Sequence, residues 1–120
     1  MASEGLHESA DLLSAETIDR HRAITSIMEE LAAVDWYDQR VNATGSPDLA
    51  EVLAHNRDEE KEHAAMTLEW LRRRDPVLDG HLRTYLFTEE SVVAEEHEAE
   101  AGGDGGGGSL GVGSLREAGS

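Results

Sequence analysis

The chain has 120 residues, enough for one domain, and no cysteine, which excludes disulfides, zinc–thiolate sites and iron–sulfur clusters. Its 26 acidic and 10 basic side chains give a formal net charge of −16, which argues against nucleic acid as a partner because phosphates would be repelled. Residues 1–10 lack the basic and apolar regions of a signal peptide, and no stretch is apolar enough to cross a membrane, so we expect a cytoplasmic protein without membrane contact.

The first strong pattern is a helix over residues 14–42, after a loose lead-in at residues 1–13. Glu30 is the only charged residue in a stripe of otherwise apolar residues that recur at helical spacing, so it is predicted to face the interior. Glu29 points about 100° away from this stripe. The other members of the stripe are Ala23, Ile27, Val34, Tyr37 and Val41.

A second helix is predicted to begin after a short turn, with Ser46 as the N-cap and Pro47 at the first position, and to end near Arg74. Because the turn is short, the two helices should be antiparallel neighbours. Glu30 and Glu60 lie at similar distances from the turn, so we expect them at about the same height. The inward stripe of this helix is apolar at both ends and polar in the middle, at Asn56, Glu60 and His63.

Three further segments follow the second helix. Apolar residues predict a short third helix over residues 77–88, and the acidic, glycine-rich residues 89–108 read as a flexible linker. Residues 109–120 regain a few apolar side chains and resemble a peptide that docks in a groove of a partner. Two long helices cannot enclose a core, so we expect an all-α hairpin whose four-helix bundle is completed by dimerisation.

Glu60 and His63 are three residues apart on one helical face and can both reach a cation. The pair alone is a weak signal, because acidic helices contain many such pairs. With Glu30, however, a dimer would supply four carboxylates and two imidazoles, the ligand set of two-metal sites in four-helix bundles. Mixed oxygen and imidazole ligands suit iron or manganese better than calcium, and zinc is possible. The alternative is a polar surface stripe in which Arg57 or Lys61 forms ion pairs.

The other candidates are weaker. Tyr37 lies one heptad from Glu30 and is most simply a core residue, although its hydroxyl could reach a ligand. His55 could pair with Glu59 but falls off the inward stripe. The remaining histidines, which we expect to be ordinary residues, are His7, His21, His81 and His97.

Several runs resemble the encapsulated ferritins. They are MEEL at 28–31, VDWYDQR at 34–40, HNRDEEKEHA at 55–64 and RTYLF at 83–87. The tail LGVGSLR at 110–116 is similar to the targeting peptide that loads cargo into encapsulin shells. The resemblance implies that residues 14–88 form a ferritin-like two-helix domain with a short third helix, in dimers assembled into a decameric ring.

The resemblance also implies a ferroxidase that oxidises Fe²⁺ to Fe³⁺ with O₂ for iron storage and detoxification inside an encapsulin nanocompartment. Two iron ions would bind per subunit pair, with Glu30 bridging them and Glu60 and His63 as terminal ligands. Tyr37 would lie beside the centre, and Glu29 would belong to an outer metal site. The shell protein would bind residues 109–116.

The chain departs from the family pattern at one position, and two other functions remain as alternatives. Ala32 stands where the family commonly has a second outer glutamate, which affects the expected outer site and not the central ligands. A helical scaffold or cargo protein stabilised by a structural metal is one alternative. A rubrerythrin-like peroxidase is the other, although the cysteines of its rubredoxin-type site are absent.

Overall fold

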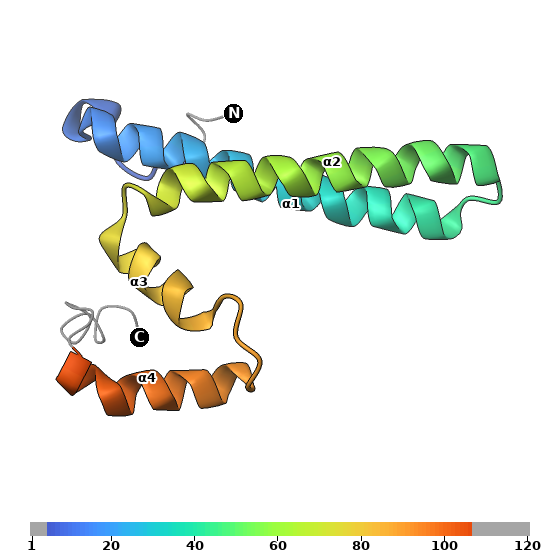
Figure 1. Cartoon of the computed structure of the whole chain (residues 1–120). Coiled ribbons are helices and arrows are strands. Elements are labelled where there is room, and N and C mark those ends of the chain that lie inside the picture. The colour runs from blue at the N-terminus through green and yellow to red at the C-terminus, as the bar shows by residue number, and fades with distance from the viewer. Residues whose placement is uncertain (1–4, 107–120) are drawn as a thin grey trace. The chain divides into compact units, whose positions relative to one another are not determined.

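The computed structural model describes residues 5–106, and every regular element in them is helical. These are the 3₁₀ helix η2 (Ala10–Leu12) and the α-helices α1 (Ala15–Ala43), α2 (Pro47–Arg72), α3 (Pro76–Tyr85) and α4 (Val92–Gly106) (Figure 1). The all-α prediction is therefore confirmed. The chain divides into two compact units, Met1–Leu71 and Arg72–Ser120, which we describe separately.

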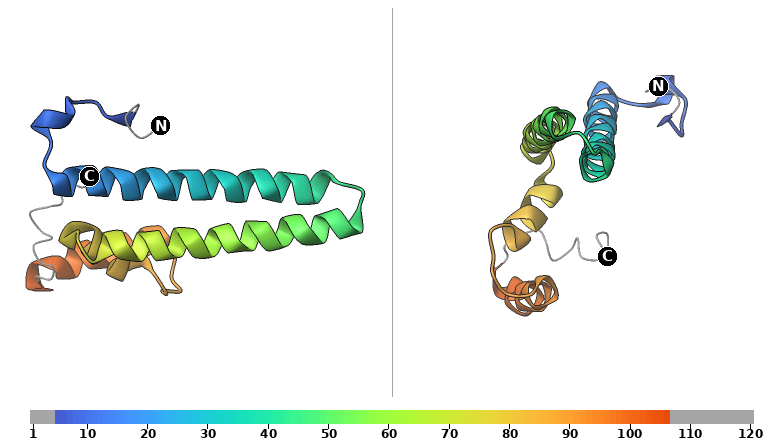
Figure 2. Two further views of the ribbon diagram at one scale, coloured as in Figure 1. Left: turned by 90° about the horizontal axis from the view of Figure 1, so that it is seen from above. Right: turned by 90° about the vertical axis from the view of Figure 1, so that its right-hand side faces the viewer.

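Side-chain caps mark the N-terminal ends of the two long helices. Ser14 Oγ accepts a hydrogen bond of 3.1 Å from the backbone N–H of Thr17 at the start of α1. Ser46 Oγ accepts one of 3.2 Å from Leu49 N–H at the start of α2, where Pro47 occupies the first helical position. The turn between the helices is short, and they run antiparallel side by side as predicted (Figures 1 and 2).

The α1–α2 hairpin buries very little of its apolar surface. Among the described residues only Ala23, Ala64 and Leu71 are buried. Large apolar side chains stay exposed on both helices: Ile24, Met28, Leu31 and Trp36 on α1, and Leu49, Val52 and Met66 on α2. A hairpin of this kind has no enclosed core, so its apolar surface calls for burial against another chain.

In the second unit, Asp75 caps α3 by accepting a 3.0 Å hydrogen bond from Leu78 N–H. The Asp79 carboxylate lies between two arginines: Arg83 Nε donates to it at 3.0 Å, and Arg72 Nη1 also donates to it. These hydrogen bonds, the stronger from Arg83, hold the pKa of Asp79 below its usual range. The ion-paired carboxylate thereby ties α3 to the end of α2.

Helix α4 corrects one expectation, because it occupies most of residues 89–108, where we predicted a flexible linker. Ser91 Oγ caps it by accepting a 3.0 Å hydrogen bond from Ala94 N–H, and alanine and glutamate, both strong helix formers, follow. The helix contacts α3. Burial, and after it the negative charges of Glu96 and Glu100, raises the pKa of Tyr85 at the end of α3. The predicted docking peptide at 109–120 lies outside the described residues.

The lead-in also has more order than we expected from sequence. It contains η2, and a Cβ added at Gly5 would lie 2.9 Å from Cε1 of His21. Glycine therefore allows this segment to approach α1 closely. None of the helices within residues 5–106 combines the length and apolar character that a membrane span requires.

Candidate metal centre

The centre of the candidate site is the pair formed by Glu60 and His63 in α2. Glu60 Oε1 lies 3.6 Å from His63 Nδ1, and their side chains are 28% and 46% exposed. The two residues are three positions apart in an unbroken helix, so their side chains project from the same face. Both groups therefore stay accessible to a cation approaching from outside the hairpin.

Glu30 in α1 contributes a carboxylate oxygen that the chain leaves unsatisfied. Its Oε1 atom is buried and has no hydrogen-bond partner among the described residues. Leaving a buried polar atom unpaired costs about 1–3 kcal/mol, and more for a charged group. A buried carboxylate is stable when a cation or a metal ion neutralises it. The surroundings of Glu30 Oε1 are therefore compatible with a role as a metal ligand.

The cationic side chains near the site form ion pairs with aspartates. Arg57 donates to Asp38 of α1 and to its neighbour Asp58, each at 3.0 Å, and Lys61 lies 3.4 Å from Asp58. The hydrogen bonds to Asp58 and Asp38 raise the pKa of Arg57. Within residues 5–106, no lysine or arginine pairs with Glu30 or Glu60. This counts against a surface stripe in which Arg57 or Lys61 neutralises Glu60.

A single chain does not bring the three predicted ligands together. In the described part of the chain, no group of three His, Cys, Asp or Glu side chains is arranged to hold a metal ion. Glu60 and His63 form one partial site, and Glu30 lies apart from them. A centre built from these residues needs ligands from a second chain.

Tyr37 and Glu29 differ in their surroundings. Tyr37 is half-buried, and the guanidinium carbon of Arg40 lies 5.6 Å from the centroid of its ring, within the range of a cation–π contact. Glu29 is exposed, in keeping with its expected direction away from the inward stripe. Ala32, at the position of the missing outer glutamate, is half-buried.

Sequence reasoning paired Glu59 with His55 but missed that Glu59 also lies near His63. Its Oε1 lies 4.0 Å from His63 Nε2, and its Oε2 lies 3.7 Å from His55 Nε2. The imidazole of His63 thus has a carboxylate on each side, Glu60 near Nδ1 and Glu59 near Nε2. Both distances from Glu59 are too long for hydrogen bonds, but a small rotation would let Glu59 orient the ring. The repeated spacing of four residues, from His55 to Glu59 to His63, was the available signal.

Comparison with known proteins identifies the family. The EncFtn-like family model matches residues 5–89. The chain is 57% identical to an encapsulated ferritin-like protein of Rhodospirillum rubrum, over 96% of this chain and 90% of the relative. It is 34% identical to the encapsulin nanocompartment cargo protein EncC of Myxococcus xanthus, over 62% of this chain and 58% of that protein.

A solved structure agrees with this result. The crystal structure of protein ne0167 from Nitrosomonas europaea superposes with a TM-score of 0.72 at 59% identity, covering 73% of this chain and 97% of that one. The family model, the close relatives and the shared helical fold lead to the same conclusion: this chain belongs to the EncFtn-like family of encapsulated ferritin-like proteins.

Proposed function

We propose that the protein is a ferroxidase, which oxidises Fe²⁺ to Fe³⁺ with O₂ at a di-iron centre shared between two chains. The observation that carries this proposal is the buried Oε1 atom of Glu30, which has no partner among the described residues. The accessible Glu60–His63 pair and the absence of a three-ligand cluster in the described part of one chain fit a centre completed by dimerisation.

The ligand set suits both oxidation states of iron. Glu30, Glu60 and His63 of the two chains would together hold the two iron ions. The two chains together supply four carboxylates, which two divalent cations offset in charge. Carboxylate oxygen is a hard donor and stabilises the more highly charged Fe³⁺ product, while imidazole is suited to iron in either state. Each Fe²⁺ would give up one electron, and the two electrons together with two protons would reduce one O₂ to hydrogen peroxide.

Two further side chains take supporting roles in this proposal. Tyr37 lies beside the centre, and its ring is held by the Arg40 contact described above. Glu29, exposed on α1, attracts Fe²⁺ at an outer site. Because Ala32 supplies no second carboxylate there, this outer site is weaker than one built from two glutamates, and the central ligands are unaffected.

We further propose that the protein is cargo of an encapsulin nanocompartment in the cytoplasm. Membership of the EncFtn-like family and the likeness to a relative named as encapsulin cargo support this role. Residues 109–116 would bind the shell protein, and dimers would assemble into a decameric ring. Fe³⁺ formed at the ring would then be stored as mineral inside the shell, which serves iron storage and detoxification.

One experiment tests the ferroxidase proposal against the two alternatives. The purified protein is loaded with Fe²⁺ without oxygen, its metal content per dimer is measured, and matched samples then receive O₂ or peroxide. We expect two iron ions per dimer and rapid Fe³⁺ formation with O₂. Bound metal that stays inert to both oxidants would instead establish a structural role, and a response to peroxide alone would establish a peroxidase.

A further inference from the structure

Arg57 joins the two long helices through its guanidinium. From α2, its Nη1 donates a 3.0 Å hydrogen bond to Asp38 Oδ1 on α1, and its Nε donates one of 3.0 Å to the neighbouring Asp58. The Arg57 side chain is 21% exposed, while that of Asp38 is 65% exposed. Two carboxylates, one on each helix, therefore fix the position of this guanidinium.

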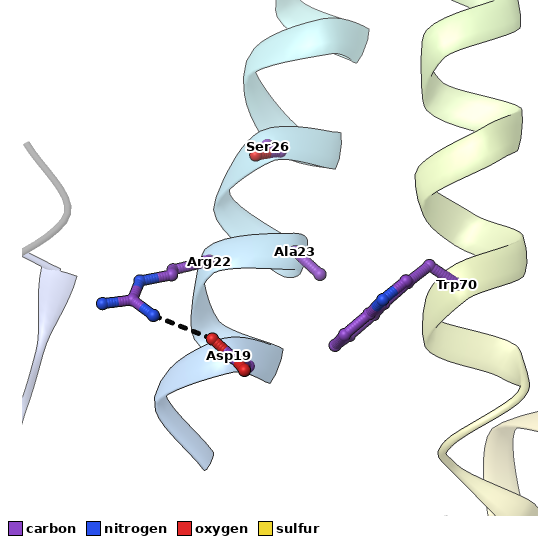
Figure 3. Close-up of a pocket in the computed structure, with 5 residues that line it drawn as sticks. All are labelled: Asp19, Arg22, Ala23, Ser26 and Trp70. Atoms are coloured by element: carbon purple, nitrogen blue, oxygen red, sulfur yellow. Dashed lines mark hydrogen bonds and ion pairs between the residues drawn. The ribbon is translucent and has the colours of Figure 1, made fainter. Parts of the chain in front are cut away.

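The same arginine precedes Glu60 by three residues, a spacing at which opposite charges on a helix pair. Elsewhere in the hairpin, Arg22 Nη1 donates to Asp19 at 2.8 Å across that spacing (Figure 3). In the described part of the chain, Arg57 forms no such pair with Glu60, which instead lies 3.6 Å from His63. The Glu60 carboxylate thus stays available although a cationic side chain is only one turn away.

We propose that Asp38 holds Arg57 away from Glu60, so that a metal ion rather than the guanidinium neutralises that carboxylate. Asp38 is then a positioning residue, which acts from α1 on a ligand of α2 through Arg57. The inference rests on the proposed function in taking Glu60 as a metal ligand.

Loss of Asp38 frees the donors that now point to α1. A guanidinium has five N–H donors, so Arg57 can keep its Nε contact with Asp58 and still turn other donors to Glu60. A cation that binds Glu60 must then displace the guanidinium first. Its apparent affinity falls in proportion to the fraction of chains in which Glu60 is free.

The expected effect is modest, because ion pairs near the surface are weak. The order of the charges also matters: on a helix, a carboxylate that precedes the cationic residue pairs better than the reverse. Arg22 and Asp19 have the favourable order, and Arg57 and Glu60 have the other. For Asp38→Asn we therefore expect the dissociation constant of Fe²⁺ to rise by about threefold.

Equilibrium dialysis of the full chain against Fe²⁺ without oxygen measures this change. Asp38→Glu keeps a carboxylate and should bind Fe²⁺ as the wild type does. Asp35→Asn is the matched control, because it removes the same charge from α1 but Asp35 accepts its 3.2 Å hydrogen bond from Gln39 and not from an arginine. Asp35 is also closer to Glu30 in sequence, so a general effect of charge would be at least as large there.

Arg57→Gln separates release of the guanidinium from two simpler explanations. With the competing cation removed, Fe²⁺ should bind at least as tightly as to the wild type, and adding Asp38→Asn should then change nothing. An ion pair that merely joins the helices would instead make Arg57→Gln as harmful as Asp38→Asn. A purely electrostatic effect would make Asp38→Asn equally harmful in both backgrounds. Either result would overturn the proposal.

A crystal structure of metal-free Asp38→Asn tests the same point without iron. We expect the Arg57 guanidinium within about 4 Å of the Glu60 carboxylate, the range of an ion pair. A guanidinium that stays away from Glu60 in this variant would refute the positioning role of Asp38. Failure of the wild type to bind Fe²⁺ would overturn the proposed function instead, and the position of Arg57 in the variant would still decide this inference.

Discussion

His63 Nδ1 and Glu60 Oε1 lie 3.6 Å apart on α2, close enough to share one cation and too far apart to satisfy each other by a hydrogen bond. This spacing leaves the carboxylate and the imidazole available to a ligand. A pair of this kind holds a metal ion firmly only when further donors complete the coordination, and in the proposed centre the buried oxygen of Glu30 would be such a donor.

Removal of either member of this pair should abolish most metal binding. We expect Glu60→Ala and His63→Ala to lose most bound iron and to slow O₂-dependent iron oxidation by more than about tenfold, since each loses a ligand in both halves of the centre. Metal analysis and absorbance of Fe³⁺ give the two readouts. Glu51→Ala, an exposed change in the same helix, is the control. Wild-type rates in both ligand variants would refute their role.

Substitution of Glu30 should have opposite effects on stability in the absence and in the presence of metal. Glu30→Met should stabilise the metal-free protein by about 1 kcal/mol, because it removes a buried oxygen without a partner and keeps a similar volume. The same variant should lose the rise in melting temperature that Fe²⁺ gives the wild type under anaerobic conditions. Thermal unfolding followed by circular dichroism, with and without Fe²⁺, checks both effects. A metal-dependent rise that persists in Glu30→Met would show that this carboxylate is no ligand.

The ion pairs of Asp79 should contribute to the stability of the second unit, and this contribution should be lost in acid. Its folded pKa lies below the ordinary value of 3.8, so its ion pairs with Arg83 and Arg72 stabilise the protein above that value. This contribution is lost as the pH falls from about 3.8 through the lower folded pKa. Asp79→Asn should therefore lower the melting temperature at pH 7, and the difference from wild type should disappear in strong acid. Glu51→Gln, which changes an exposed carboxylate, should show no such pattern.

Deletion of the C-terminal residues should separate iron oxidation from loading into the encapsulin shell. Deletion of residues 109–120 should leave iron oxidation by the purified protein unchanged, because the proposed ligands all lie before that segment. The truncated chain should no longer co-purify with encapsulin shell protein when the two are expressed together. Full loading of the truncated chain would show that another surface directs it to the shell.

The long helices were predictable because their signals are local. Ser46 and Pro47 mark the start of α2 through the chemistry of a helix cap, and the proximity of Glu60 to His63 follows from helical spacing alone. Helix α4 was missed because the search relied on apolar periodicity, which an alanine- and glutamate-rich helix with exposed faces lacks.

The environment of Glu30 illustrates what a sequence cannot supply. Its place on an inward stripe was predictable, but the burial of one particular oxygen depends on how the side chains of α1 and α2 pack. The φ angle of Phe87 is likewise outside the reach of pattern reasoning, because nothing in the residue type favours the left-handed region. Completion of the proposed centre depends on a second chain, and a single sequence indicates that chain only through the ligands that one chain lacks.

The scarcity of buried side chains has a consequence for the cell. In the proposed dimer, a hairpin in which only Ala23, Ala64 and Leu71 are buried would gain folding free energy when chains meet, so its stability would follow mass action. Under the proposed function, iron chemistry then begins only above a threshold amount of the protein. Chains present at low abundance would stay inert toward iron, and the level of synthesis would itself act as the switch.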